Sequence, residues 1–95
     1  SYLGSFRNNM FYGYGLFTWN DGRSYEGLYK NNLKSGFGKM IFTNKIIYEG
    51  NWDCGRQNGE GKLIFPNNKI KNGIWKEGKC ILLNDQYELS LEVKI

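Results

Sequence analysis

A 23-residue period organises most of this sequence. Tyr25-Glu26-Gly27 recurs 23 residues later as Tyr48-Glu49-Gly50, and the same frame moved back by 23 falls on Tyr2-Leu3-Gly4. In each copy the fifth position is aromatic and a Gly-x-Gly follows at a fixed offset: Phe6 with Gly13 and Gly15, Tyr29 with Gly36 and Gly38, Trp52 with Gly59 and Gly61. Such a period is typical of arrays of small units that bury apolar surface against their neighbours.

The period predicts three full repeats, at about residues 2–24, 25–47 and 48–70. A fourth, truncated copy at 71–83 keeps Gly73 and Trp75 but has Lys71 in place of the leading tyrosine. A chain of 95 residues is too short for two independent cores, so we expect one domain spanning residues 1–95.

Each copy is predicted to be an antiparallel β-hairpin, because apolar and small residues alternate in short bounded runs. If Gly27 lies opposite Gly38, the ring of Tyr29 lies opposite Gly36. The other predicted pairs are Tyr25 with Met40, Glu26 with Lys39, Trp52 with Gly59, Gly50 with Gly61, Glu49 with Lys62, Phe6 with Gly13 and Leu3 with Leu16. A glycine opposite a ring lets the ring lie over the backbone. The predicted structural glycines are Gly27, Gly36, Gly38, Gly50, Gly59 and Gly61.

Polar segments separate the predicted strands. Residues 30–35 are expected to form a flexible hairpin loop, and the links between copies carry turn residues, as in Asn20-Asp21-Gly22. After an expected turn at Asn84-Asp85, apolar and polar side chains alternate strictly over residues 86–95, which predicts a capping strand. The first copy has no such cap, so its edge is open to self-association or to further repeats of a longer protein.

These features together predict an all-β fold. Two strands alone are marginally stable, so neighbouring hairpins must stack to bury their aromatic face. The expected architecture is a single-layer, elongated antiparallel sheet of stacked 23-residue hairpins with a C-terminal capping strand.

Composition limits the functions open to such a sheet. The chain has no histidine, which removes the commonest general base and metal-ligand nitrogen, so neither an enzyme nor a metal or other cofactor is predicted. Cys54 and Cys80 are expected to be reduced, buried thiols of a cytoplasmic protein. No apolar run approaches the roughly 20 residues of a membrane span. The net charge of +4 gives a mild preference for acidic partners.

The Tyr-x-Gly-x-aromatic segment followed by Gly-x-Gly, at a 23-residue period, resembles the MORN repeat (membrane occupation and recognition nexus). The resemblance covers residues 2 to about 83 and departs from the pattern at Leu3 and Lys71. It implies a non-enzymatic module whose concave aromatic groove takes up a partner's helix or extended peptide, in cytoskeletal, ciliary or membrane-junction assemblies. Association with phosphoinositides or other acidic phospholipids is the alternative that it implies.

Two sets of candidate binding residues follow. The rings are expected to pack within the sheet and, as the resemblance implies, to line the partner groove: Tyr25, Tyr29, Tyr48, Trp52 and Trp75. The alternative set would contact an acidic ligand or lipid from one long edge: Lys30, Lys34, Arg56 and Lys76. A ladder of Lys39, Lys62 and Lys79 also suggests lipid binding, but Glu26 and Glu49 lie opposite two of these lysines and favour simple solvated pairs.

Other classes of function are weaker. Nucleic-acid binding is disfavoured because aromatic residues and lysines alternate without a known stacking motif. Carbohydrate- or choline-binding arrays are also aromatic and glycine-rich, but they have a shorter period and lack the paired Gly-x-Gly. We therefore predict a cytoplasmic protein-binding scaffold, with association with the cytoskeleton or a membrane as a further expectation.

Overall fold

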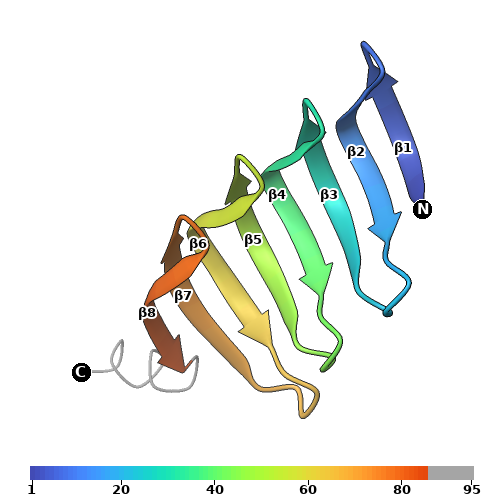
Figure 1. The fold of residues 1–95 in the computed structure, drawn as a ribbon. Helices are drawn as coiled ribbons and strands as arrows, with labels where there is room; N and C mark the ends of the chain where they lie inside the picture. The colour runs from blue at the N-terminus through green and yellow to red at the C-terminus, as the bar shows by residue number, and fades with distance from the viewer. Residues whose placement is uncertain (86–95) are drawn as a thin grey trace.

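The computed structural model describes residues 1–85 as one open sheet of eight antiparallel strands in sequence order (Figure 1). The strands are β1 (Tyr2–Arg7), β2 (Met10–Thr18), β3 (Ser24–Lys30), β4 (Leu33–Ile41), β5 (Ile47–Asp53), β6 (Arg56–Ile64), β7 (Ile70–Lys76) and β8 (Lys79–Asp85). The molecule extends over 52 × 23 × 18 Å. The prediction of an elongated, single-layer all-β sheet is confirmed. The capping strand predicted at 86–95 lies outside the described residues.

Two-residue turns close the four hairpins. In Asn8-Asn9, Asn31-Asn32, Cys54-Gly55 and Glu77-Gly78 both residues have positive φ, between 49° and 85°. Turns of this kind match the right-handed twist of paired strands, and Asn and Gly tolerate them best. The loop predicted at 30–35 is therefore wrong, because only Asn31-Asn32 turns the chain and β4 begins at Leu33.

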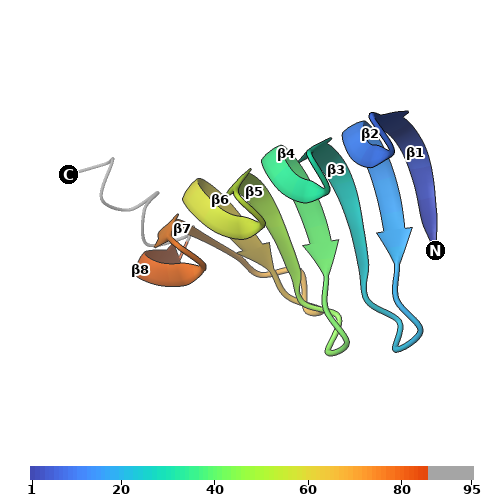
Figure 2. The same ribbon diagram turned by 45° about the horizontal axis from the view of Figure 1, so that its top comes forward.

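The links between hairpins share one turn chemistry. The side-chain Oδ1 atoms of Asp21, Asn44 and Asn67 accept the backbone N–H two residues further on, at 3.0–3.1 Å. The linking turns follow one long edge of the sheet and the hairpin turns the other (Figure 2). The chain was expected to turn at Asn84-Asp85, but it continues in β8, which stays paired to β7 as far as Lys71 and Asp85.

Both cysteines differ from expectation. Cys54 and Cys80 are free thiols as predicted, but both are exposed rather than buried. Cys54 occupies a hairpin turn, and Cys80 lies on β8, the last described strand of the sheet.

Seven glycines form a row across the middle of the sheet, one on each strand from β1 to β7. Consecutive members pair directly: Gly4–Gly15, Gly15–Gly27, Gly27–Gly38, Gly38–Gly50, Gly50–Gly61 and Gly61–Gly73. The predicted pairs Leu3–Leu16, Tyr25–Met40, Glu26–Lys39 and Glu49–Lys62 are confirmed.

The glycine predicted opposite each ring belongs to a different hairpin. Within their own hairpins Phe6 pairs with Phe11, Tyr29 with Lys34 and Trp52 with Gln57, so the three predicted ring–glycine pairs are wrong. A bulge causes the difference, because β3 advances two residues from Gly27 to Tyr29 while β4 advances four from Lys34 to Gly38. Each bulge glycine instead faces the ring of the next hairpin: Gly13 faces Tyr29, Gly36 faces Trp52 and Gly59 faces Trp75.

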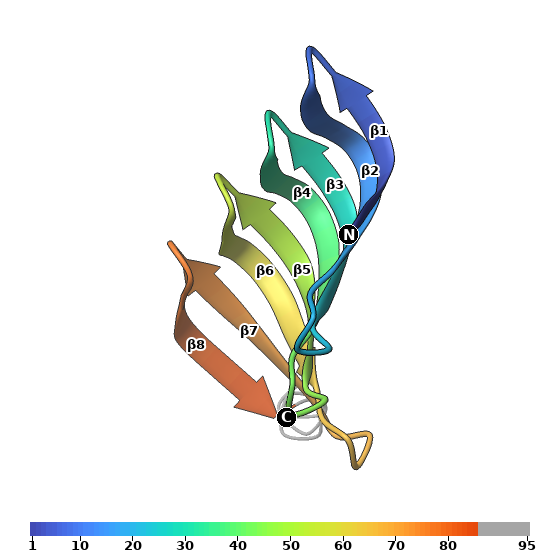
Figure 3. The same cartoon turned by 45° about the vertical axis from the view of Figure 1, so that its right-hand side comes forward.

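The core is a chain of aromatic rings on one face of the sheet. Tyr25 lies edge-on to both Tyr29 and Trp52, at centroid distances of 5.1 and 5.4 Å. Tyr48 repeats this arrangement with Trp52 and Trp75, at 5.2 and 4.8 Å. Edge-to-face geometry at these distances is favourable beyond simple burial. The strands bend along their length (Figure 3), as bulges cause them to do.

Candidate docking groove opposite the rings

The five predicted groove residues are the buried core of the sheet. Tyr25 and Tyr48 are 0% exposed, and Tyr29, Trp52 and Trp75 are 5–6% exposed. Three of them also donate to backbone carbonyls: the Tyr25 and Tyr48 hydroxyls to Leu28 and Asn51, both at 2.9 Å, and Trp52 Nε1 to Gly38 at 3.2 Å. Burial raises the pKa of Tyr29 and of Tyr48 to about 12. These rings therefore leave little surface for a partner in the structure as described.

The predicted structural glycines support this core in two ways. A Cβ on Gly38 or Gly61 would approach the tyrosine ring of its own hairpin to within 2.1–2.7 Å, and a Cβ on Gly27 or Gly50 would collide with the neighbouring strand's backbone. Gly36 and Gly59 occupy the bulges with φ of +91°, a conformation that L side chains rarely adopt. The glycines thus hold the rings close to the sheet and bend it.

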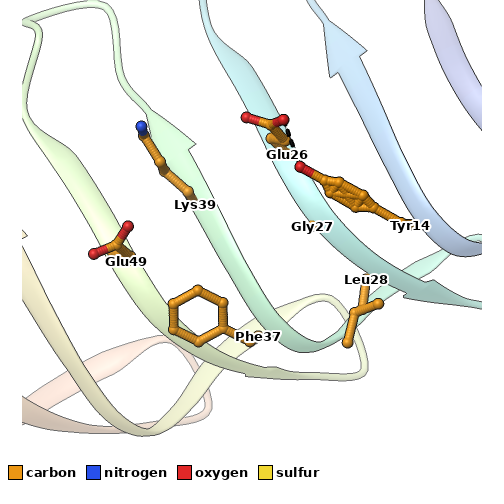
Figure 4. Close-up of a pocket in the computed structure, with 7 residues that line it drawn as sticks. All are labelled: Tyr14, Glu26, Gly27, Leu28, Phe37, Lys39 and Glu49. Carbon is orange, nitrogen blue, oxygen red and sulfur yellow. Dashed lines mark hydrogen bonds between the residues drawn. The ribbon is translucent and has the colours of Figure 1, made fainter.

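The opposite face carries an open groove that crosses the strands. Its floor is the glycine row, with Gly27, Gly50, Gly61 and Gly73 among the lining residues of three adjoining hollows. The first of these hollows encloses about 390 Å³ between β2 and β5. Figure 4 shows its two walls, with Glu26, Lys39 and Glu49 on one side of Gly27 and Leu28 and Phe37 on the other.

The first wall is a row of alternating charge, with one residue from each of the strands β3 to β6. The row runs through Glu26 on β3, Lys39 on β4, Glu49 on β5 and Lys62 on β6, each paired with the next across the sheet. Lys62 Nζ lies 3.4 Å from Glu49 Oε1, an ion pair that is partly exposed to solvent. Glu26 instead accepts a hydrogen bond from the Tyr14 hydroxyl, which raises the pKa of that phenol.

The second wall is largely apolar and exposed. Tyr14, Leu28 and Phe37 are 52%, 43% and 55% exposed. Asn51 and Glu60 continue this wall, and Ile74 and Leu82 complete it at the C-terminal end. Large apolar side chains at this level of exposure, gathered along one groove, are typical of docking surfaces.

The lysines and arginine of the predicted lipid set do not lie together. Lys30, Arg56 and Lys76 are exposed at strand ends beside the hairpin turns, as expected. Lys34 lies within β4, where its Nζ is 5.3–5.5 Å from the ring centroids of Trp19, Tyr25 and Trp52. Burial lowers the pKa of Lys34. The expectation that Lys34 lies in a loop on the exposed edge is wrong, because the tight Asn31-Asn32 turn places it inside the strand.

The exposed apolar wall was not among the predicted site residues, although the sequence contains a signal for it. Tyr14 and Phe37 are the middle residues of the first two Gly-x-Gly motifs, and Leu28 follows the third residue of its Tyr-Glu-Gly. Strict alternation along a strand places such residues on the face opposite the glycines and rings.

A family model for the MORN repeat matches residues 2–22, 25–45 and 48–70, which is most of the chain. The chain belongs to the MORN-repeat family. No curated protein matches the chain. MORN repeats are generally modules for interaction with proteins or membranes, and the repeat itself is non-enzymatic.

Two further observations concern the described residues of this MORN array. Within residues 1–85 no three His, Cys, Asp or Glu side chains come close enough together to hold a metal ion. Among the same residues no helix is long and apolar enough to cross a membrane.

Proposed function

We propose that this MORN array is a protein-binding scaffold that docks a partner helix in the groove opposite the rings. The observation that carries the proposal is the pairing of two unlike walls along one groove: a row of alternating charge and a row of exposed apolar side chains. The apolar wall supplies burial and the charged wall supplies orientation, a division found in specific interfaces.

The spacing of the charges favours a helix over an extended peptide. Neighbouring strands are about 4.8 Å apart, so Glu26 and Glu49, two strands apart, are separated by about 9.6 Å along the groove. A helix rises about 1.5 Å per residue, so side chains at i, i+3 and i+7 recur at about 4.5 and 10.5 Å. Alternate side chains on one face of a strand recur at about 6.8 Å and lose register with the row.

The groove can be tested with peptides selected from a phage-displayed library on the folded chain. Binding of a labelled selected peptide would be followed by fluorescence anisotropy. We expect Phe37→Asp to weaken it at least about tenfold, about 1.4 kcal/mol, because the apolar wall loses its most exposed ring. Leu33→Asp is the matched control, since Leu33 lies on the same strand at 47% exposure but outside the groove lining.

Reversing the charged row tests the register. The fourfold variant Glu26→Lys, Lys39→Glu, Glu49→Lys, Lys62→Glu keeps opposite charges at every pair of the row and inverts the pattern that a partner meets. It also removes the Tyr14–Glu26 hydrogen bond, so Glu26→Gln alone, which keeps an acceptor for Tyr14, serves as the control for that loss. A helical peptide selected on the wild-type chain should bind this variant poorly, and the same peptide with its own charges reversed should bind again. Equal binding of both peptides to both proteins would contradict docking along the row.

A second candidate is association with acidic membranes through the hairpin-turn edge. Lys30, Arg56 and Lys76 lie at strand ends on that edge, which Figure 1 shows running along one side of the sheet. Each basic residue near an anionic surface contributes about 1 kcal/mol, a contribution that salt screens. Reversing these three residues to Glu should then abolish pelleting with phosphatidylserine vesicles. Reversing Lys45 and Lys69, which lie in the linking turns on the opposite edge, should not.

A further inference from the structure

The three junctions between consecutive hairpins are built alike. At each one, the second strand of one hairpin pairs with the first strand of the next, and a bulge glycine faces a ring. The glycines Gly13, Gly36 and Gly59 all have positive φ, of 74–91°. The rings that they face, Tyr29, Trp52 and Trp75, are only 5–6% exposed.

A backbone hydrogen bond marks each junction as well. The second turn residue of the following hairpin donates its N–H to the preceding hairpin, from Asn32 to the Phe11 carbonyl at 3.1 Å and from Gly55 to the Lys34 carbonyl at 2.9 Å. Gly78 repeats the bond to the Gln57 carbonyl at 2.9 Å. A junction therefore consists of a covered ring, a paired strand edge and a paired turn amide.

Strand β1 has the features that the first strand of the following hairpin shows at each junction. Phe6 occupies the ring position but is 60% exposed, because no strand of residues 1–85 pairs with the outer edge of β1. Asn9 occupies the turn position of Asn32 and Gly55, but none of the described hairpins precedes it to supply the carbonyl. Leu3, earlier on the same strand at the position of Glu26 and Glu49, is 76% exposed. An exposed strand edge with apolar side chains is a template for pairing.

We propose that the outer edge of β1 is a binding site for the second strand of another MORN hairpin, one that carries Gly-x-Gly followed by an apolar residue. The first glycine is required because the residue facing the ring adopts positive φ in all three junctions. The apolar residue follows from Leu3, which stands where the later hairpins have Glu26 and Glu49. A lysine opposite Leu3 would meet no carboxylate, whereas an apolar side chain would extend the cross-strand apolar pair of Leu3 and Leu16 by one strand.

A second copy of this chain fits the edge less well. Strand β8 has Leu83, not glycine, opposite Gly73, and none of its residues has positive φ. Its bulge is also one residue shorter, because Ile74 and Trp75 pair with Leu82 and Cys80. Two β1 strands paired with each other would set ring-bearing strands side by side with no bulge glycine between them. Within this chain, the hairpin strand that carries Gly-x-Gly followed by an apolar residue is β2, with Gly13-Tyr14-Gly15-Leu16. In the sheet, β2 is already paired on both sides.

The test adds such a strand to the full chain. A copy of residues 2–23 placed directly before Ser1 keeps the 23-residue period, because Ser1 then stands in the place of Ser24. Amide hydrogen exchange of Asn9 and the urea unfolding curve would be measured with and without the added copy. The control carries Gly13→Val in the added copy alone, which denies the bulge its positive φ.

We expect the added copy to slow exchange at Asn9 by about a hundredfold or more and to unfold with the rest in one transition of steeper urea dependence. The control should leave exchange at Asn9 unchanged. Separate unfolding of the added copy, or exchange at Asn9 as fast as in the original chain, would overturn the proposal. Sedimentation equilibrium would show whether the original chain is a dimer. A dimer in which the Asn9 amide is already protected from exchange would assign the edge to a second copy of the chain and would also overturn the proposal.

Discussion

Trp52 lies opposite Gly36 of the preceding hairpin, and its indole Nε1 donates to the carbonyl of Gly38 in that same hairpin. The ring of one repeat is thus held by the glycines of another. Stability in this sheet therefore resides largely at the junctions between hairpins, as in other arrays whose units contact only their neighbours.

Truncating a junction ring should destabilise the whole array. We expect Trp52→Ala to lower the free energy of unfolding by about 3–5 kcal/mol, because a ring that is 6% exposed is replaced by a cavity between two hairpins. Chemical denaturation followed by circular dichroism measures this loss. Phe6→Ala is the matched control at the open edge, where the ring is 60% exposed, and should cost much less. Equal losses for the two variants would refute the junction model of stability.

The glycine row should resist even the smallest side chain. A Cβ on Gly38 would lie 2.1 Å from the hydroxyl oxygen of Tyr25, so the buried ring must move. Gly38→Ala is expected to cost about 1–3 kcal/mol, the range for overpacking a core, in urea denaturation. Ser35→Ala, on the same strand and with its Cβ already present, provides the comparison. A Gly38→Ala protein as stable as Ser35→Ala would show that the row is not close-packed.

Alkaline pH should unfold the protein through its buried phenols. Burial raises the pKa of Tyr29 and Tyr48 from 10.0 to about 12 in the folded state. Their contribution to stability is complete below pH 10, where the phenols of the unfolded chain are protonated, and it is lost as the pH rises from about 10 to about 12. The loss of unfolding free energy across this window should be smaller in Tyr48→Phe than in the wild type. An identical loss in both proteins would contradict this assignment.

Lys34 and Lys30 should differ in their effects on stability. Lys34 packs against three rings, whereas Lys30 is exposed at the end of β3. We expect Lys34→Ala to cost about 1–2 kcal/mol through lost ring contacts and Lys30→Ala to change stability by less than about 0.5 kcal/mol. Thermal unfolding of the two variants distinguishes them. A larger loss of stability in Lys30→Ala than in Lys34→Ala would contradict the packing of Lys34 against the rings.

The sequence correctly predicts the glycine pairs and the Glu–Lys pairs within hairpins, because a period of 23 indicates both the hairpin and its register near Gly27 and Gly38. The pairs across the junctions, which join them into continuous rows, come from the structure. The prediction of the register fails beyond Gly27 and Gly38, at the bulge. Strict alternation predicts that Tyr29 pairs with Gly36. In the structure, β4 has two more residues than β3 between the paired positions, and Gly36 adopts positive φ within this bulge. A glycine can be needed because a side chain would collide with a neighbour or because the backbone adopts positive φ, and the sequence alone does not distinguish these two roles.

The candidate site is harder to infer from the sequence, for a related reason. Tyr25 and Trp52 are large aromatic residues in a single-layer sheet, which suggests an exposed binding face. Their exposure is 0% and 6% because the glycines let each ring lie close to the sheet and contact a neighbouring hairpin. The exposed apolar surface is instead formed by Leu28 and Phe37 on the other face. These residues line one groove with Glu26 and Lys39 only when the strands are assembled into the sheet.

The most direct measurement of the central claim is chemical-shift mapping by NMR of the folded chain as a selected helical peptide is added. Docking opposite the rings predicts the largest changes at Leu28, Phe37 and Lys39 and at the glycine amides between them. The indole signals of Trp52 and Trp75 should stay nearly unchanged. Changes centred on those indoles, or confined to Lys30, Arg56 and Lys76 beside the hairpin turns, would contradict the assignment of the groove.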